Sequence, residues 1–266
     1  MIRESFYRVL KRKRFYLLIF IIFFVNALDV LPRAKFPIIT DKLILQSAYL
    51  ETIMGNGSLD KGYIAFIFMA FILAALPMSD CFLEDKESGI DKIYLLKVPK
   101  SKYIKSRFII NFFYGGFMVS VVIFINLLIW LMIRPTFAIY YYNTSLVNNL
   151  FLIDLLIDSP ILFYLVILLR LFFIGGVIAS FAMFLNEISK SRYIGLGGVF
   201  ILDIIVTLII SIVRDKVGLF ESYKSIFELL GGFLSNVTIT SFIYPIILLV
   251  IPLVYFFVIK KDREVL

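Results

Sequence analysis

The chain contains no histidine and a single cysteine, Cys81, and these two shortages remove much of the side-chain chemistry that enzymes use. Without an imidazole there is no histidine metal ligand and no histidine base for a serine-type triad. A lone cysteine excludes a disulfide within the chain. The sequence also lacks a phosphate-binding loop of the GxxxxGK[ST] type. We therefore do not expect this chain to be an enzyme, or to bind a metal or a nucleotide itself.

Long apolar segments make up most of the sequence. Of 266 residues, 61% are hydrophobic and 29 are Phe, a composition typical of a protein with several membrane spans. About 20 apolar residues in a helix cross the hydrocarbon core, and six segments come near that length. The sequence predicts an all-α polytopic membrane protein with one transmembrane domain over residues 1–266 and spans at 15–31, 63–79, 108–133, 161–185, 193–213 and 243–259.

The segments that flank these spans differ in positive charge. Residues 1–14, 80–107, 186–192 and 260–266 together hold 18 Lys and Arg, whereas the segments on the other side hold eight. Cytoplasmic flanks retain Lys and Arg, so both termini are predicted to be cytoplasmic in a bacterial cell membrane. This bias accounts for the net charge of +8, which favours contact with the lipid bilayer and does not indicate a nucleic-acid partner.

The N-terminal segment combines apolar and basic residues. Ile2, Phe6, Val9 and Leu10 fall on one helical face, with five basic residues around and after them. This pattern predicts an interfacial helix on the inner leaflet. The alternative is an ordinary basic anchor for the first span.

Residues 80–107 form a dense polar segment between two long apolar runs. The second span is predicted to continue as a helix to Glu87, where Ser88 and Gly89 provide a left-handed stop. A short helix follows, and Pro99 ends it. Ser101 is predicted to cap the helix that becomes the third span. One face of this short helix carries Ile90, Ile93, Tyr94 and Lys97, with Leu96 beside them.

Such a helix presents a ridge that fits a groove on another protein. The alternative is a loop helix that packs against lipid or against its own chain.

The polar segment resembles the first cytoplasmic loop of the type-2 permease family of ABC transporters, which carries an acidic, glycine, leucine and proline pattern. Here the loop reads EDKESGIDKIYLLKVP from Glu84 to Pro99, followed by SKYIKSR and an apolar helix. Two positions depart from the family pattern: Ile90, where Thr is common, and Lys100, where a small residue is common. The resemblance extends to the layout of six spans.

The resemblance implies a permease subunit of an exporter, which moves a peptide or another amphipathic substrate. It implies a second permease copy or paralogue as partner, and separate ATP-binding subunits that hold ATP and Mg. The short helix would be the coupling helix, and a short external re-entrant helix would precede the last span. The residues carried over are Glu84, Glu87 and Gly89 for the turn, Ile90, Ile93, Tyr94, Leu95 and Leu96 for the contact surface, and Pro99 for the end of the helix.

Two ionised residues, Arg170 and Asp203, fall near the middle of the fourth and fifth spans. A charge at that depth costs about 2.5–3.5 kcal/mol on insertion scales, so each residue requires a partner. They are expected either to pair with each other and lock the two spans together, or to line a polar substrate route, with Asn126 as a weaker candidate for that route. A stand-alone immunity or sensing protein, and an ion-coupled carrier that uses Arg170 and Asp203, are the alternative functions.

Small residues cluster inside three of the predicted spans. Gly115-Gly116, Gly175-Gly176 and the group Gly195, Gly197 and Gly198 occupy positions where helices are able to approach closely. Each cluster predicts a tight helix contact.

Overall fold

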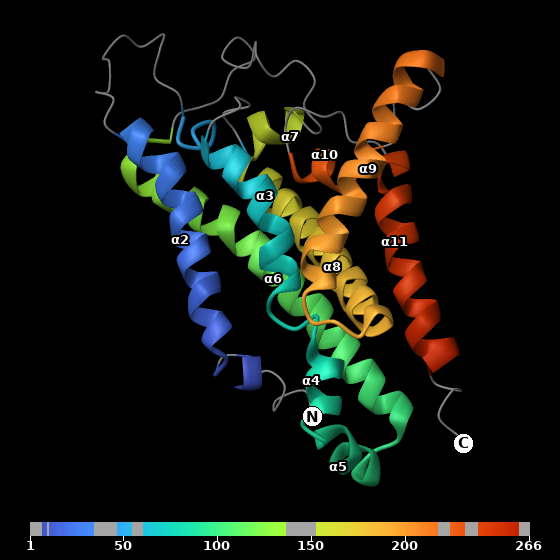
Figure 1. Ribbon diagram of the computed structural model, residues 1–266. Coiled ribbons are helices and arrows are strands. Elements are labelled where there is room, and N and C mark those ends of the chain that lie inside the picture. Colours follow the sequence, from blue (N-terminus) through green and yellow to red (C-terminus); the bar gives the residue numbers. More distant parts are fainter. Residues whose placement is uncertain are drawn as a thin grey trace.

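The computed structural model describes residues 7–9, 11–34, 47–54, 61–136, 153–217, 224–231 and 239–260; the side chains of residues 153, 215–217 and 239 are excepted. Within these ranges all regular secondary structure is helical (Figure 1). The predicted all-α class is therefore confirmed.

Five helices are long and apolar enough to cross a membrane. They are α2 (Lys13–Ala34), α6 (Lys100–Ile133), α8 (Pro160–Ser189), α9 (Ile194–Val217) and α11 (Ile243–Val254), the last of which continues as the π-helical turn η4 (Tyr255–Ile259). Large apolar side chains remain exposed along their outer faces, for example Phe20, Ile205 and Ile247. Length and exposure together identify a membrane protein.

The second predicted span is shorter than expected. Its helix α3 (Lys61–Ala75) has 15 residues, or about 22 Å, which is less than the hydrocarbon thickness of about 30 Å. Turns occupy residues 76–80, and a separate helix α4 (Cys81–Glu87) follows. The predicted continuous helix from this span to Glu87 is therefore wrong. Pro77 explains the break, because it has no amide hydrogen and restrains the residue before it.

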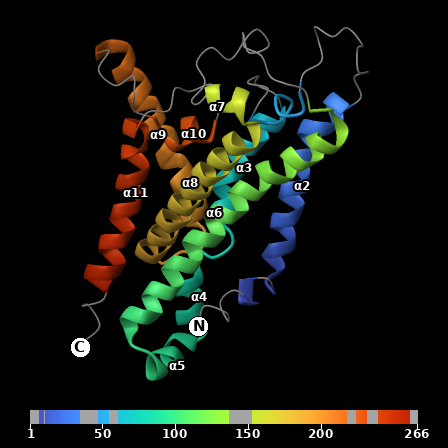
Figure 2. The same ribbon diagram turned by 180° about the vertical axis from the view of Figure 1, so that it is seen from behind.

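The helices form one bundle with polar segments at both ends. α6 and α8 cross at its centre, α2 and α3 lie on one side, and α9 and α11 lie on the other (Figures 1 and 2). Helices α4 and α5 (Ile90–Lys97) cover one end, whereas α7 (Ile153–Asp158) and α10 (Ile226–Leu230) lie at the opposite end.

Both ends of the described chain lie at the α4–α5 end of the bundle. Arg8 bonds to Asp85 of α4, and Lys260 pairs with Glu187 near the end of α8, at 2.8 Å. The described termini are therefore on the same side of the bundle.

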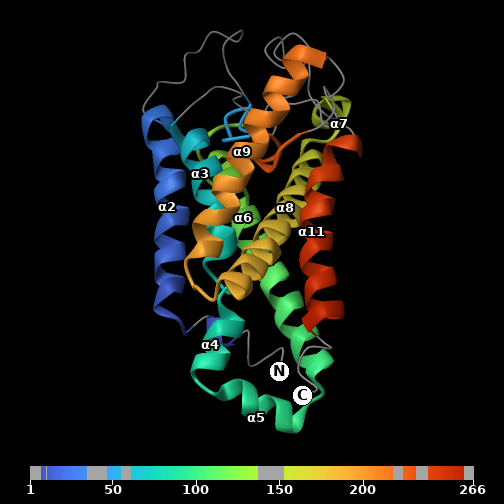
Figure 3. The same ribbon diagram turned by 45° about the vertical axis from the view of Figure 1, so that its right-hand side comes forward.

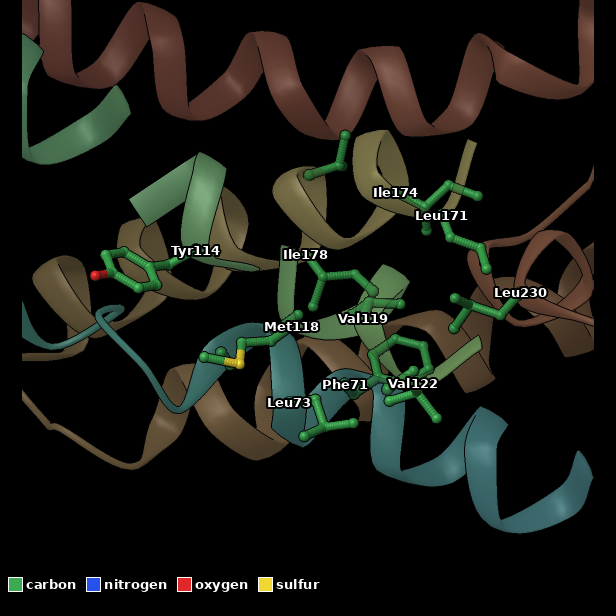
Figure 4. Close-up of a cluster of buried hydrophobic side chains, with 14 of the residues drawn as sticks. Phe71, Leu73, Tyr114, Met118, Val119, Val122, Leu171, Ile174, Ile178 and Leu230 are labelled. Carbon is green, nitrogen blue, oxygen red and sulfur yellow. The ribbon is translucent and has the colours of Figure 1, made fainter. Parts of the chain in front are cut away.

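Glycines bring α6 and α8 into backbone contact. A Cβ atom added at Gly115 would lie 2.3 Å from the Cβ of Ala179, and one at Gly116 would lie 2.3 Å from the carbonyl oxygen of Phe172. From the other side, a Cβ at Gly175 would lie 2.7 Å from the carbonyl oxygen of Gly115. The predicted close contact is confirmed. Figure 4 shows the apolar side chains that pack around it, among them Val119 of α6 and Ile178 of α8.

In the third glycine cluster, the predicted tight contact is confirmed for Gly195 but, within the described residues, is not seen for Gly197. A Cβ at Gly195 would lie 2.2 Å from the carbonyl oxygen of Ala182, and its amide donates to Asn186 Oδ1 at 2.6 Å. Asn186 in turn donates to Ser79 Oγ at 3.1 Å, which fastens the start of α9 to α8 and to the turn after α3. Around Gly197, by contrast, no atom of the described residues lies within 4 Å of the position of an added Cβ, so the predicted tight contact is not formed with this part of the chain.

Candidate functional site

Helix α5 begins and ends where the sequence predicts. Gly89 has φ 69°, the left-handed conformation that favours glycine, and α5 starts at the next residue. Val98 is extended, and Pro99 with φ −53° immediately precedes α6. The predicted cap at Ser101 is wrong, because the fixed φ of Pro99 allows α6 to begin already at Lys100.

None of the residues of α5 is buried, and its exposed residues include three apolar ones beside Lys92 and Lys97. Leu96 is 87% exposed, Ile93 is 55% exposed and Leu95 is 38% exposed. Ile90 is half-buried. Figure 3 shows α5 lying across the end of the bundle. Three of the five residues predicted for the contact surface are thus exposed, and we refer to them together as the α5 ridge: Ile93, Leu95 and Leu96.

Tyr94 does not belong to this ridge, contrary to the prediction. Its ring stacks on Tyr103 of α6 with 6.0 Å between ring centroids. The guanidinium carbon of Arg107 lies 5.3 Å from the centroid of Tyr94 and 5.6 Å from that of Tyr103. Cation–π and stacking contacts of this kind attach α5 to α6.

A buried carboxylate, Asp85, lies at the centre of this attachment. Its side chain has no exposed surface. It pairs with Arg107 at 2.7 Å and with Arg8 at 2.5 Å, and it accepts a hydrogen bond from the hydroxyl of Tyr103 at 2.8 Å. Asp85 therefore joins the N-terminal segment, α4 and α6. Sequence reasoning missed Asp85, Arg107 and Tyr103, because it treated them as part of a solvated loop.

The predicted turn residues Glu84 and Glu87 are engaged in ion pairs. Glu84 pairs with Arg12 and, at 3.5 Å, with Arg8. Glu87 pairs with Arg192 in the segment before α9. Both side chains thus pair with residues outside α4, and among the predicted turn residues only Gly89 shapes the turn itself.

Basic residues of the N-terminal segment also pair with Asp80, the buried residue just before α4. Arg14 pairs with Asp80 at 2.6 Å, and Arg12 lies 3.3 Å from Asp80 and donates to the carbonyl oxygen of Pro77 at 2.9 Å. Of the predicted interfacial helix, the structure describes Tyr7–Val9, where Val9 is buried. Ile2, Phe6 and Leu10 lie outside the described residues.

Cys81 is buried at the start of α4, with its sulfur 3.9 Å from Met183 Sδ. Burial raises the pKa of its thiol from 9.0 to about 12. At pH 8 the thiol would therefore remain protonated and unreactive. We expect maleimide to modify Cys81 slowly in mild detergent and rapidly after unfolding in SDS, as followed by mass spectrometry.

A variant with Cys81→Ser and Ser88→Cys provides the control, because Ser88 is exposed on the same loop. Its thiol should react rapidly in the folded protein. Equal rates for the two proteins in mild detergent would contradict the buried position of Cys81.

Asp203 binds the start of α10. Its two carboxylate oxygens accept hydrogen bonds from the backbone amides of Ile226 at 3.1 Å and Phe227 at 2.8 Å. Ser225 and Glu228 add a capping box, in which Ser225 Oγ accepts from the Glu228 amide at 3.2 Å and Glu228 accepts from the Ser225 amide at 3.0 Å. Helix α10 lies where the re-entrant helix is expected and buries Ile226, Leu229 and Leu230.

The expected ion pair between Arg170 and Asp203 is not formed. Asp203 is committed to α10, and no guanidinium nitrogen of Arg170 has a hydrogen-bond partner among the described residues. Arg170 is nevertheless only 6% exposed.

Asn126 belongs to a separate and closed polar cluster. It donates to Asp29 Oδ2 at 2.7 Å and accepts from the backbone amide of Ile53 at 2.9 Å. Asp29 also accepts from Trp130 Nε1 at 2.9 Å and pairs with Arg33. Since both its amide nitrogen and its oxygen are engaged, Asn126 fastens α6 to α2 and to residues 47–54, and the structure does not show it lining an open route.

No protein-family model matches the chain, and no curated protein or solved structure matches it either. Its function has therefore to be inferred from its own geometry and chemistry.

Proposed function

We propose that the chain is the membrane-spanning permease subunit of an ATP-driven exporter of the type-2 ABC family. The observation that supports this most directly is the α5 ridge. An exposed apolar surface on a short helix, at the polar end of a membrane bundle, is the kind of surface that a partner protein covers.

The attachment of α5 suits the transmission of movement. The Asp85, Arg107, Tyr94 and Tyr103 contacts connect α5 with α6, a single helix of 34 residues that continues from the polar end through the bundle. A displacement of α5 would therefore carry α6 and α4 with it as a rigid body. This is the property that a coupling helix requires.

The remaining components follow from this role. ATP and Mg would be held by a separate ATP-binding subunit that contacts α5, and a second copy of the chain or a paralogue would complete the substrate pathway. The excess of Lys and Arg in the segments at the α5 end favours a cytoplasmic position, where ATP is available. Export of a peptide or another amphipathic molecule is the activity that we infer.

Disrupting the α5 ridge should release the partner. We expect the double variant Ile93→Asp, Leu96→Asp to lose the ATP-binding subunit on purification in mild detergent, and with it the ATPase activity of the complex. Charged residues at a desolvated apolar contact typically abolish binding, whereas α5 itself buries neither side chain and should fold normally. Expression with the neighbouring genes, affinity purification, mass spectrometry and an ATPase assay measure this.

Ile188 offers a matched control, because it is 54% exposed near the end of α8 and does not belong to α5. Ile188→Asp should retain the partner. A wild-type protein that purifies intact but never with an ATP-binding subunit would favour a stand-alone immunity or sensing protein.

A further inference from the structure

Arg170 differs from the other arginines that the structure describes. Arg8, Arg12, Arg14, Arg33, Arg107, Arg192 and Arg214 each form an ion pair, and Arg134 donates to the carbonyl oxygen of Arg33 at 3.3 Å. Arg170 has neither kind of partner within the described ranges, although all three of its guanidinium nitrogens are buried.

A polar neighbour of Arg170, Tyr63, already has a hydrogen-bond partner. The hydroxyl of Tyr63 donates to the carbonyl oxygen of Gly231 at 2.8 Å. Ile167 and Ile174, one helical turn away on either side of Arg170, are buried apolar residues. The guanidinium is thus a permanent positive charge with unused donors in an apolar setting.

An unpaired buried charge is strongly unfavourable, and its natural counterpart is an oxyanion. Arg170 lies ten residues after the first residue of α8, or about 15 Å along the helix, which is near half the hydrocarbon thickness. The phosphates of bilayer lipids lie at the surface of the membrane and not at this depth. A carboxylate has to be brought there by a molecule that enters the bundle.

We propose that Arg170 is a binding residue for the carboxylate of an amphipathic peptide substrate, held between α3, α8 and α10. This assignment rests on the proposed function in so far as the ligand is taken to be the exported molecule. It deepens that function by naming the substrate class: an apolar body with a single carboxylate.

Binding is measured on the full chain alone, in neutral detergent with phosphatidylcholine. The probe is an N-acetylated hydrophobic tripeptide with a free C-terminal carboxylate, compared with its C-terminal amide. We expect wild type to bind the acid about tenfold more tightly than the amide, and Arg170→Met to lose this preference. Arg134→Met is the control, because Arg134 is paired with a carbonyl oxygen, and it should retain the preference.

Ligand-free stability provides a second measurement that does not depend on the choice of peptide. Without ligand, Arg170→Met should melt at the same temperature as wild type or higher, because it removes an unpaired buried charge. Arg107→Met should melt lower, because it leaves Asp85 buried without this partner. The fluorescence of Trp130, the only tryptophan, follows the melting.

Three results would overturn the proposal: equal binding of acid and amide by wild type, an unchanged preference in Arg170→Met, or a lower melting temperature of that variant without ligand. Stabilisation by added phosphatidylglycerol alone would also overturn it, and would assign a lipid phosphate to Arg170. None of these results involves the ATP-binding subunit, so a failure here is distinguishable from a failure of the role proposed for α5.

Discussion

Replacing Asp85 with alanine is expected to lower the free energy of unfolding by about 3–5 kcal/mol, the cost typical of removing one partner of a buried ion pair. The side chain is fully buried, and its loss would leave Arg107 without its carboxylate and Tyr103 without its acceptor. Arg8 would lose a contact as well. Titration with SDS in mixed micelles, followed by Trp130 fluorescence, measures the change.

The matched control is Glu87→Ala, in the same helix. Glu87 is 57% exposed and its pair with Arg192 lies at the surface, so its loss should change the stability by less than about 1 kcal/mol. Similar losses in the two variants would show that Asp85 is not the centre of the attachment. Loss of the ATP-binding subunit from Asp85→Ala would connect this network to the α5 ridge.

Gly115→Ala is expected to destabilise the protein by about 1–3 kcal/mol, although alanine normally favours a helix over glycine. The added methyl would lie 2.3 Å from the Cβ of Ala179, 2.9 Å from the carbonyl oxygen of Gly175 and 3.0 Å from that of Ala74. Two of these three atoms are backbone atoms, so α6 and α8 have to separate. The same SDS titration measures the loss.

Two variants separate packing from helix propensity. Gly197→Ala adds a methyl group that meets no atom of the described ranges within 4 Å, so it should leave the stability unchanged or raise it by up to about 1 kcal/mol. Adding Ala179→Gly to Gly115→Ala removes one of the three close contacts and should restore part of the stability. If Gly115→Ala and Gly197→Ala behaved alike, the contact between α6 and α8 would not be tight.

Features that depend on local sequence could be predicted. Gly89 and Pro99 delimit α5 because their backbone preferences act on adjacent residues. The lengths of the apolar segments correctly predicted the five long helices. The glycine pairs of α6 and α8 correctly predicted the close contact between these two helices. The second span was overestimated because Leu76, Pro77 and Met78 are apolar and extend a hydropathy pattern, whereas Pro77 interrupts the helix.

Contacts between distant residues could not be predicted. Arg8 and Asp85 are 77 positions apart, and the amides that Asp203 accepts from are 23 and 24 positions away. No periodic pattern connects such pairs. For the same reason Tyr94 was assigned to the outer surface of α5: its spacing fits the apolar face, but its ring turns towards Tyr103 and Arg107. Which side of a short helix faces its own bundle depends on the side chains of the neighbouring helix that it packs against, and these are distant in sequence.

The carboxylate of Asp203 has a mechanical consequence. It belongs to α9 and holds the first amides of α10, so the two helices are tied together. The far end of α10 is attached to α3 by the hydrogen bond from Tyr63 to the carbonyl oxygen of Gly231. A movement of α9 away from α3 would therefore have to break either the bonds from α10 to Asp203 or the bond from Tyr63 to Gly231.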